Sequence, residues 1–347
     1  MMKIYYIVDN VNPRHGGGRY AGDLISAIKN TGCEVVVLEQ KSKRLGGLIL
    51  DAIKIRKHLK NCDIVHAIDG YPYAIVAAVA NIGLNKKLII TVQGTYAVAP
   101  LYNFVAGTLL KWAYKRADKI IAISQYTQNE ILKKANLSNI EVINPGIDFK
   151  KFYKIPVYSD EKFILSVGAL KYRKGYHISI PAFALAKKEL PDLKYKIVGS
   201  QKDVAYFKHL KDLAFENGVA GDVEFLSGVS DEALSDLYRR AKLFILTSVE
   251  ENHHFEGFGI VYLEAAASGL PIVATSNSGA SSAVKDGYNG LLVHQNDLRA
   301  TTDAVLKILE DSEFKTKLGN NSREWVKEFS WEKIITDYNK IYSNLQK

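Results

Sequence analysis

Cysteine and methionine are scarce in this sequence, with two residues of each among 347. Cys33 and Cys62 are too few for a disulfide framework and lack the spacing of metal ligands, so we expect free thiols. No stretch approaches the roughly 18 uninterrupted apolar residues of a membrane-spanning helix, and the N-terminus lacks the organisation of a signal peptide. These absences argue against a disulfide-stapled or membrane-spanning protein and predict a cytoplasmic one.

Charge of one sign is in excess, and the excess lies in the first part of the chain. Residues 1–150 hold 20 Lys and Arg against 11 Asp and Glu, whereas residues 151–347 hold 26 against 26, so the net charge of +9 is N-terminal. Much of it falls in two amphipathic stretches, Lys41 to Lys60 and Leu109 to Lys119. Such stretches are either solvated helix faces or a face that docks on an anionic membrane surface. Nucleic acid is disfavoured, because no recognised binding motif accompanies the charge.

Short apolar, β-branched segments alternate with helical patterns along the whole chain, whose 347 residues exceed the usual size of one hydrophobic core. The predicted strands are 3–8, 34–38, 64–67, 87–92, 119–123, 141–143, 163–167, 194–198, 223–226, 243–246, 271–274 and 290–293. This alternation predicts an α/β fold of two Rossmann-like, doubly wound parallel sheets.

A polar, Lys-rich stretch with Pro156 separates two series of strands. We therefore predict an N-terminal domain at 1–150 and a C-terminal domain at 151–330. Residues 331–347 show apolar positions at helical spacing, including Ile334, Tyr338 and Ile341, and so predict a final helix that packs on one of them.

Three glycines open a predicted helix near the N-terminus, in the sequence Gly16-Gly-Gly-Arg-Tyr-Ala21. The pattern formally matches a dinucleotide-binding fingerprint, with Glu39 at the end of the next strand. However, about seven residues separate the first strand from Gly16, too many for the tight turn of that fingerprint. A nicotinamide-dependent oxidoreductase is therefore disfavoured, while backbone N–H groups open to an anion remain a feature of these glycines.

The densest chemical signal runs from Glu250 to Pro271. We predict that Glu256 lies in a glycine-rich loop and that a helix begins near Phe258, with Glu264 about two turns into it. Carboxylates beside helical N–H groups suit a polyhydroxylated anion, and the alternative is that both glutamates are merely exposed. A metal site at His253-His254-x-Glu256 is disfavoured, because adjacent imidazoles lack the i, i+4 spacing of a helical zinc site.

A second cluster carries three cations directly after a predicted strand, in Ser166-Val-Gly-Ala-Leu-Lys171-Tyr-Arg173-Lys174-Gly175. Arg can clamp two oxygens of one anion, and Lys supplies a point charge. The cluster therefore predicts a phosphate-binding loop, with a solvated surface loop as the alternative.

Taken together, these motifs resemble glycosyltransferase family 4, a retaining family with the GT-B fold of two Rossmann-like domains facing across a cleft. Its hallmark Glu-x7-Glu stands here as Glu256-Gly-Phe-Gly-Ile-Val-Tyr-Leu-Glu264. Further matches follow in family order: Gly16 to Gly18, Asp63 to His66, Ile123-Ser124, Asn144 to Asp148, Lys174-Gly175, Val198-Gly199, Phe225 to Val229, Asp286 to Gly290 and the helix from Trp331.

The resemblance implies a role for each matching residue. Glu264 would hold the nucleotide ribose, Glu256 the donor sugar, and Lys174 with Arg173 the leaving diphosphate. The implied donor-binding residues also include Gly17, Gly18, Gly168, Lys171, Gly199, Phe258 and Gly259. Contacts to acceptor or donor sugar are implied for His66, Gln93 and Gly94. The last helix would return to the first domain.

The implied activity is that of a retaining hexosyltransferase, taking sugar from a UDP- or GDP-sugar to a glycan, lipid-linked or other hydroxyl acceptor. The resemblance further implies cell-surface polysaccharide or glycoconjugate synthesis and a peripheral position at the inner face of the membrane. We expect no cofactor and no metal ion. Three departures affect residue roles: Ala169 replaces an arginine, Gln93 a histidine and Ser282 a glutamate. A nucleotide-sugar-binding protein without turnover, and a phosphorylase or sugar-phosphate synthase on the same scaffold, therefore remain alternatives.

Overall fold

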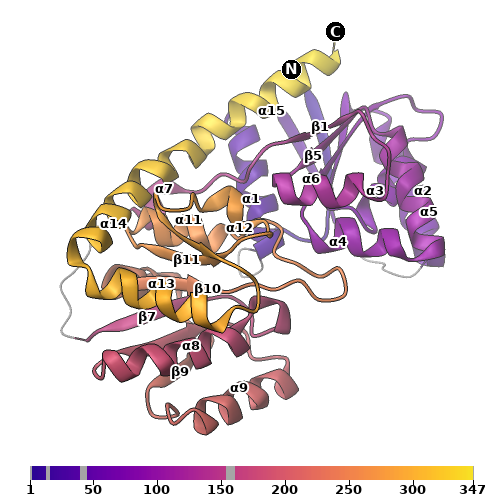
Figure 1. Cartoon of the computed structure of the whole chain (residues 1–347). Helices are drawn as coiled ribbons and strands as arrows, with labels where there is room; N and C mark the ends of the chain where they lie inside the picture. Colours follow the sequence, from indigo (N-terminus) through magenta and orange to yellow (C-terminus); the bar gives the residue numbers. More distant parts are fainter. Residues whose placement is uncertain (1, 13–15, 40–44, 154–160, 347) are drawn as a thin grey trace. The chain divides into compact units, whose positions relative to one another are not determined.

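The computed structural model describes residues 2–12, 16–39, 45–153 and 161–346. The chain forms two compact units, one of Met1–Ile147 with Phe329–Lys347 and one of Asp148–Glu328 (Figure 1). Pro156 and the first residues of the basic stretch from Lys41 fall outside the described residues. None of the described helices is long and apolar enough to cross a membrane.

The first unit is built on a parallel sheet with the strand order β2-β1-β3-β4-β5-β6. Its strands are β1 (Lys3–Val8), β2 (Glu34–Glu39), β3 (Ile64–Ile68), β4 (Lys87–Val92), β5 (Lys119–Ala122) and β6 (Ile140–Val142). Its helices are α1 (Gly16–Lys29), α2 (Leu45–Leu59), α3 (Tyr73–Ala80), α4 (Thr95–Val98), η1 (Ala99–Tyr102), α5 (Phe104–Arg116), α6 (Gln125–Leu132) and α15 (Trp331–Gln346). The strand order reverses between β1 and β3, and ligands of open α/β sheets bind beyond the carboxyl ends of such strands.

The second unit repeats this plan with the strand order β12-β11-β10-β7-β8-β9, again all parallel. Its strands are β7 (Phe163–Val167), β8 (Lys194–Val198), β9 (Val223–Leu226), β10 (Leu243–Leu246), β11 (Ile272–Thr275) and β12 (Gly290–Val293). Its helices are α7 (Phe149–Phe152), η2 (Tyr172–Lys174), α8 (Tyr176–Glu189), α9 (Val204–Glu216), α10 (Asp231–Arg240), α11 (Ile260–Ala267), α12 (Ala280–Ala283), α13 (Leu298–Glu310), α14 (Ser312–Val326) and η3 (Lys327–Phe329). The strand order reverses between β7 and β10.

The final helix α15 packs on α1 of the first unit. Two buried pairs of tyrosines fix it there: the hydroxyls of Tyr6 and Tyr342 lie 2.7 Å apart, and those of Tyr20 and Tyr338 lie 2.5 Å apart. Buried hydroxyls need such partners because an unpaired polar group in the core is costly. The helix is thus held in register by hydrogen bonds as well as by apolar contacts.

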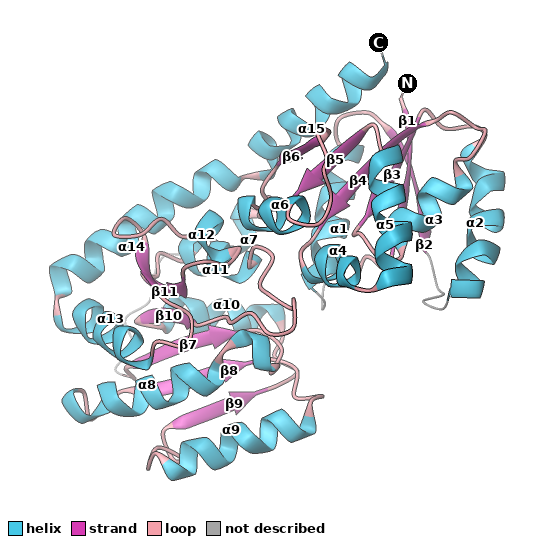
Figure 2. Cartoon of the chain, turned by 45° about the vertical axis from the view of Figure 1, so that its right-hand side comes forward, coloured by secondary structure: helices cyan, strands magenta, loops and turns pink. Residues whose placement is uncertain are grey.

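The predicted α/β architecture of two parallel, doubly wound sheets is confirmed, and Figure 2 shows helices around each sheet. Each predicted strand is present within one residue of its predicted bounds. The apolar runs are short and buried on both faces, as strands of parallel sheets are.

Candidate functional site

The two loops that leave β7 and β10 meet at the strand reversal of the second sheet. Gly175 ends the loop after β7 in a left-handed conformation (φ +70°), and a Cβ at this position would lie 1.7 Å from the main-chain oxygen of Thr247. The Thr247 hydroxyl donates to the Gly175 carbonyl at 2.7 Å, and the Val249 N–H donates to the Arg173 carbonyl at 2.9 Å. Glycine is therefore required for the two loops to approach this closely.

The loops bring together the cations and the first glutamate of the predicted site. The ammonium of Lys174 forms an ion pair with one carboxylate oxygen of Glu256. Arg173 donates from Nη1 to the same oxygen at 3.1 Å. Lys174 and Glu256 are buried. The alternatives of an exposed Glu256 and of a Lys174 on a solvated surface loop are therefore wrong.

The electrostatics of this group are set by burial and by the ion pairs. Burial raises the pKa of Glu256, but the charges of Lys174 and Arg173 outweigh it and hold that pKa below its usual value. Burial lowers the pKa of Lys174, and Glu256 only partly opposes this. Two cations share one carboxylate, so the cluster keeps one net positive charge, which favours an anionic ligand.

The second glutamate lies on α11, which begins at Ile260 after Gly259 (φ +85°). The helix therefore starts two residues later than predicted, and Glu264 lies about one turn into it rather than two. Glu264 is 1% exposed and accepts a hydrogen bond from the Tyr238 hydroxyl at 2.9 Å. It is not a surface residue.

The remaining predicted donor-side residues surround this cluster. A Cβ at Gly199 would lie 1.8 Å from the Gly168 carbonyl oxygen, so the ends of β7 and β8 pack main chain on main chain. A Cβ at Gly168 would lie 3.2 Å from Cε of Lys174. Phe258 is buried and Lys171 is exposed. Of the two cations that could compensate for Ala169, Arg173 is the one that reaches Glu256.

The predicted residues of the first unit lie around the carboxyl ends of β1, β3 and β4. A Cβ at Gly17 would lie 3.4 Å from Oε1 of Gln93, so these two residues are neighbours. Gly18 packs against Asn10 and Asn12, and Gly94 (φ +110°) precedes α4.

The prediction that the His66 ring contacts a sugar is wrong in this structure. His66 is fully buried, with Nδ1 2.9 Å from the Tyr342 hydroxyl and Nε2 2.8 Å from the Thr91 hydroxyl. Burial lowers the pKa of His66 to about 3, so the ring is neutral. Since both nitrogens have partners, His66 ties β3 to β4 and α15 instead of facing a ligand.

A carboxylate that the sequence analysis missed, Asp69, lies next to Gln93. It follows β3 with φ +83°, a conformation that is uncommon outside glycine. Its Oδ1 accepts from the Gly70 N–H at 2.7 Å and from the main-chain N–H of Gln93 at 3.5 Å. Burial raises the pKa of Asp69 to about 6, with Asp9 contributing in the same direction. The signal that could have found it is an acidic residue directly after a buried strand beside the strand reversal.

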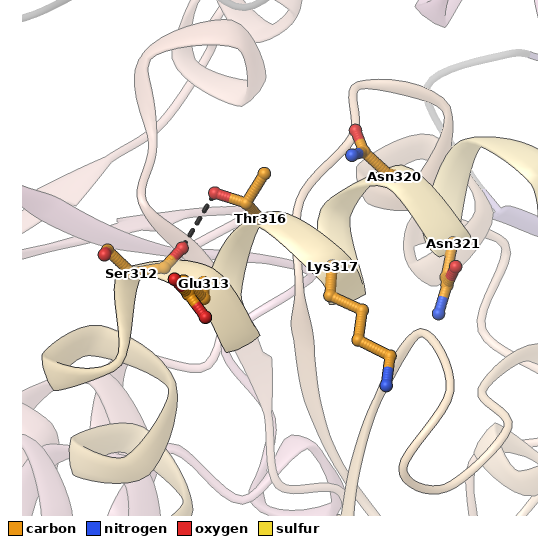
Figure 3. Close-up of a pocket in the computed structure, with 6 residues that line it drawn as sticks. All are labelled: Ser312, Glu313, Thr316, Lys317, Asn320 and Asn321. Atoms are coloured by element: carbon orange, nitrogen blue, oxygen red, sulfur yellow. Dashed lines mark hydrogen bonds between the residues drawn. The ribbon is translucent and has the colours of Figure 1, made fainter.

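A separate depression on α14 has no chemistry that converges on it. Figure 3 shows its lining residues, all from that one helix: Ser312, Glu313, Thr316, Lys317, Asn320 and Asn321. No group of three or more His, Cys, Asp or Glu side chains that could hold a metal ion occurs among the described residues. The strand reversals, not this depression, are therefore the candidate sites.

Solved structures show where this two-unit architecture occurs. Anabaena HepE, crystallised with UDP-glucose, superposes with a TM-score of 0.84 and 20% identity, over 99% of this chain and 100% of that one. WaaG, a glycosyltransferase involved in lipopolysaccharide biosynthesis, superposes with a TM-score of 0.73 and 20% identity over 98% and 99%. The fold is therefore GT-B, the fold that the resemblance implied.

Sequence comparison narrows the class to a family. The family model "Glycosyl transferases group 1" matches residues 148–325, and "Glycosyltransferase Family 4" matches residues 14–151. An uncharacterized glycosyltransferase of Methanocaldococcus jannaschii is 30% identical over 302 residues, 86% of this chain and 80% of that protein. The GDP-mannose-dependent alpha-(1-6)-phosphatidylinositol monomannoside mannosyltransferase of Mycolicibacterium smegmatis is 29% identical over 267 residues, which are 73% of this chain and 69% of that protein. The chain therefore belongs to the glycosyl transferases group 1 and is a glycosyltransferase of the family 4 type.

Proposed function

We propose that this glycosyltransferase moves a hexose from a UDP- or GDP-sugar to a hydroxyl acceptor with retention at the anomeric carbon. The observation that carries the proposal is the buried cluster of Lys174, Arg173 and Glu256, where two cations share one carboxylate. Support for the donor class comes from HepE, which was crystallised with UDP-glucose, and from the GDP-mannose-dependent relative.

The reaction needs a site that stabilises separating charge. As the bond from the anomeric carbon to the diphosphate oxygen breaks, negative charge grows on the leaving group and positive charge on the sugar. In this proposal Lys174 and Arg173 stabilise the diphosphate, and Glu256, which contacts both cations, orients the sugar hydroxyls beside them. The acceptor hydroxyl enters on the face that the diphosphate leaves, and its proton passes to the diphosphate.

We further propose that the cations of the cluster replace a metal ion as the counter-charge of the diphosphate. The nucleotide-sugar is a substrate, so no cofactor is part of the proposal. The acceptor is a glycan or a lipid-linked hydroxyl compound, as in cell-surface polysaccharide or glycoconjugate synthesis. Its proposed binding place is the carboxyl edge of the first sheet, around Gln93 and Gly94.

A thermal-shift screen against UDP, GDP, ADP and CMP and their sugar conjugates tests the donor side. A nucleotide at about 100 times its dissociation constant stabilises the folded protein by about 2.7 kcal/mol. We expect one nucleoside diphosphate to raise the melting temperature and Glu264→Gln to remove most of that shift, because a neutral amide accepts ribose hydroxyls less well than a carboxylate.

The matched control for this screen is Glu310→Gln on α13, where the glutamate is exposed and far along the chain from the cluster. Shifts by a dinucleotide or a phosphosugar alone would contradict the proposal and favour an oxidoreductase or a sugar-phosphate enzyme. A shift by nucleotide-sugar without transfer to any acceptor would favour a binding protein.

Asp69 is proposed as an acceptor-side residue, since it lies beside Gln93 at the strand reversal of the first sheet. Among the described residues, Asp9 lies near enough to raise its pKa further, and the phenols of Tyr73 and Tyr114 interact with it electrostatically. The ionised carboxylate accepts a hydrogen bond from the incoming hydroxyl more strongly than the protonated acid does. Because its pKa is raised to about 6, the ionised fraction falls about tenfold for each pH unit below that value.

We therefore expect the rate constant kcat/KM for the acceptor to fall below pH 6 in the wild type. Asp69→Asn should lower kcat/KM at pH 8 and abolish this acid limb, while donor binding in the thermal-shift assay stays unchanged. The control is Asp63→Asn, at the opposite end of β3. If the acid limb persists in Asp69→Asn, another group carries it and the role of Asp69 is structural.

A further inference from the structure

An exposed tyrosine directly precedes the two cations of the donor cluster. Tyr172 shares the short helix η2 with Arg173 and Lys174 and is 43% exposed. Single exposed rings are ordinary on protein surfaces, so the surroundings of the ring decide whether it can serve a ligand. Those surroundings hold Tyr172 rigidly beside the cluster.

The ring of Tyr172 lies flat on the imidazole of His177. The two ring centroids are 4.1 Å apart and the ring planes are inclined by 21°, which is a stacked arrangement. The ring of Tyr206 lies beside the stack, with its centroid 5.9 Å from that of Tyr172 and its plane inclined by 57°. One face of the Tyr172 ring is therefore covered, and its exposed surface belongs to the opposite face and the ring edge.

Hydrogen bonds hold the imidazole in place. Nδ1 of His177 lies 2.9 Å from the Tyr206 hydroxyl, and both residues lie in the first turns of their helices, α8 and α9. The Asp203 side chain caps α9 by accepting from the Tyr206 N–H at 3.1 Å. Burial, with a contribution from His209, lowers the pKa of His177 to about 4, so the ring is neutral near pH 7. The stack thus consists of two uncharged rings in fixed positions.

The main chain around Tyr172 is fixed as well. The Gly175 N–H donates to the Tyr172 carbonyl at 2.9 Å, which closes the turn of η2. The Leu170 N–H donates to the Ser200 carbonyl at 2.9 Å, which ties the loop after β7 to the loop after β8. Tyr172 is therefore an ordered part of the carboxyl edge of the second sheet, where ligands of α/β proteins bind.

We propose that the exposed face of Tyr172 is the surface on which the nucleobase of the donor stacks. This inference rests on the proposed function, because the cations beside Tyr172 are those assigned to the diphosphate. One ribose joins the base to the diphosphate, so the base of a bound nucleotide reaches a ring next to these cations. Every nucleobase has a π face, so stacking adds affinity for uracil and guanine alike. A ring already held by His177 loses little conformational entropy when the base binds.

Isothermal titration calorimetry of the full chain with UDP, GDP and inorganic diphosphate tests the proposal. Inorganic diphosphate carries the charges that the cations bind, but it has no base. Tyr172→Ala should weaken binding of the nucleotide about fivefold to a hundredfold, the contribution of one stacked base, and leave the affinity for inorganic diphosphate unchanged. Tyr172→Phe keeps the ring, so it should bind both ligands within about twofold of the wild type.

Tyr153 provides the matched control in the same unit. It is 44% exposed, and its ring stacks on that of Phe149 with centroids 4.4 Å apart and planes inclined by 26°. It follows α7, away from the loop that carries the donor cations. Tyr153→Ala should therefore leave the affinities for the nucleotide and for inorganic diphosphate unchanged.

Two results in Tyr172→Ala would overturn the proposal. An equal loss of affinity for nucleotide and inorganic diphosphate would mean that the ring only supports the loop after β7. No loss of affinity for either ligand would mean that no base lies on the ring, while the cation site of the proposed function would stand. If the wild type bound neither nucleotide nor inorganic diphosphate, the donor site itself would fail, and the stacking surface with it.

Discussion

Replacing Lys174 with alanine is expected to lower the rate of sugar transfer about a hundredfold to a thousandfold, the usual effect of losing one preorganised group from a site of developing charge. Lys174 is the most buried cation of the cluster, and its ammonium contacts the carboxylate of Glu256. Water cannot replace it easily, because the loops after β7 and β10 close around it. The measurement is kcat with the donor found in the nucleotide screen.

The variant also leaves Glu256 with Arg173 as its sole cationic partner in the cluster, and removing one member of a buried ion pair costs stability. A double variant separates the two effects. Lys174→Met with Glu256→Gln removes both charges, so the melting temperature should recover relative to Lys174→Ala while transfer stays low. Lys188→Ala, on the exposed face of α8, is the control and should leave kcat unchanged. A near-normal kcat in Lys174→Ala would refute the placement of the diphosphate.

The fold could be predicted from the sequence because the strands of a parallel sheet are buried on both faces. Segments such as Phe163–Val167 and Leu243–Leu246 are continuous apolar runs between helical patterns, and this signal depends on local composition alone. The start of α11 was harder to predict. Gly259 takes a left-handed conformation, which a residue inside an α-helix does not, so the helix begins only at Ile260.

The candidate site could be predicted only in part from the sequence. Three cations after a strand end predicted an anion site, and the structure brings two of them to Glu256. His66 and Asp69 show what local patterns miss. The histidine lies two positions before the end of its strand and points into the core. There one ring nitrogen is hydrogen-bonded to the hydroxyl of Tyr342, which is 276 residues further along the chain. Asp69 belongs to the site only through its neighbour Gln93, which comes from the next strand.

The second large effect is expected at Gly175, where alanine should abolish stable folding of the second unit. A Cβ there would lie 1.7 Å from the Thr247 main-chain oxygen and 3.0 Å from its hydroxyl oxygen. Main chain cannot rotate away as a side chain can, so the loops after β7 and β10 would have to separate. The same loops hold Lys174 and Glu256 together, so any molecules that fold should also lose the nucleotide-induced thermal shift.

Gly218 provides the matched control, because its φ of +71° equals that of Gly175 within a degree, while a Cβ there would meet nothing within 4 Å. Both alanine variants carry the backbone strain of the left-handed region, about 1–2 kcal/mol, but only Gly175→Ala adds the collision. Urea unfolding should therefore show a loss of about 1–2 kcal/mol for Gly218→Ala and more than about 4 kcal/mol, or no folded protein, for Gly175→Ala. Equal unfolding midpoints would mean that the loops can part at little cost. The close approach of the two strand ends would then not be what assembles the cation and carboxylate cluster.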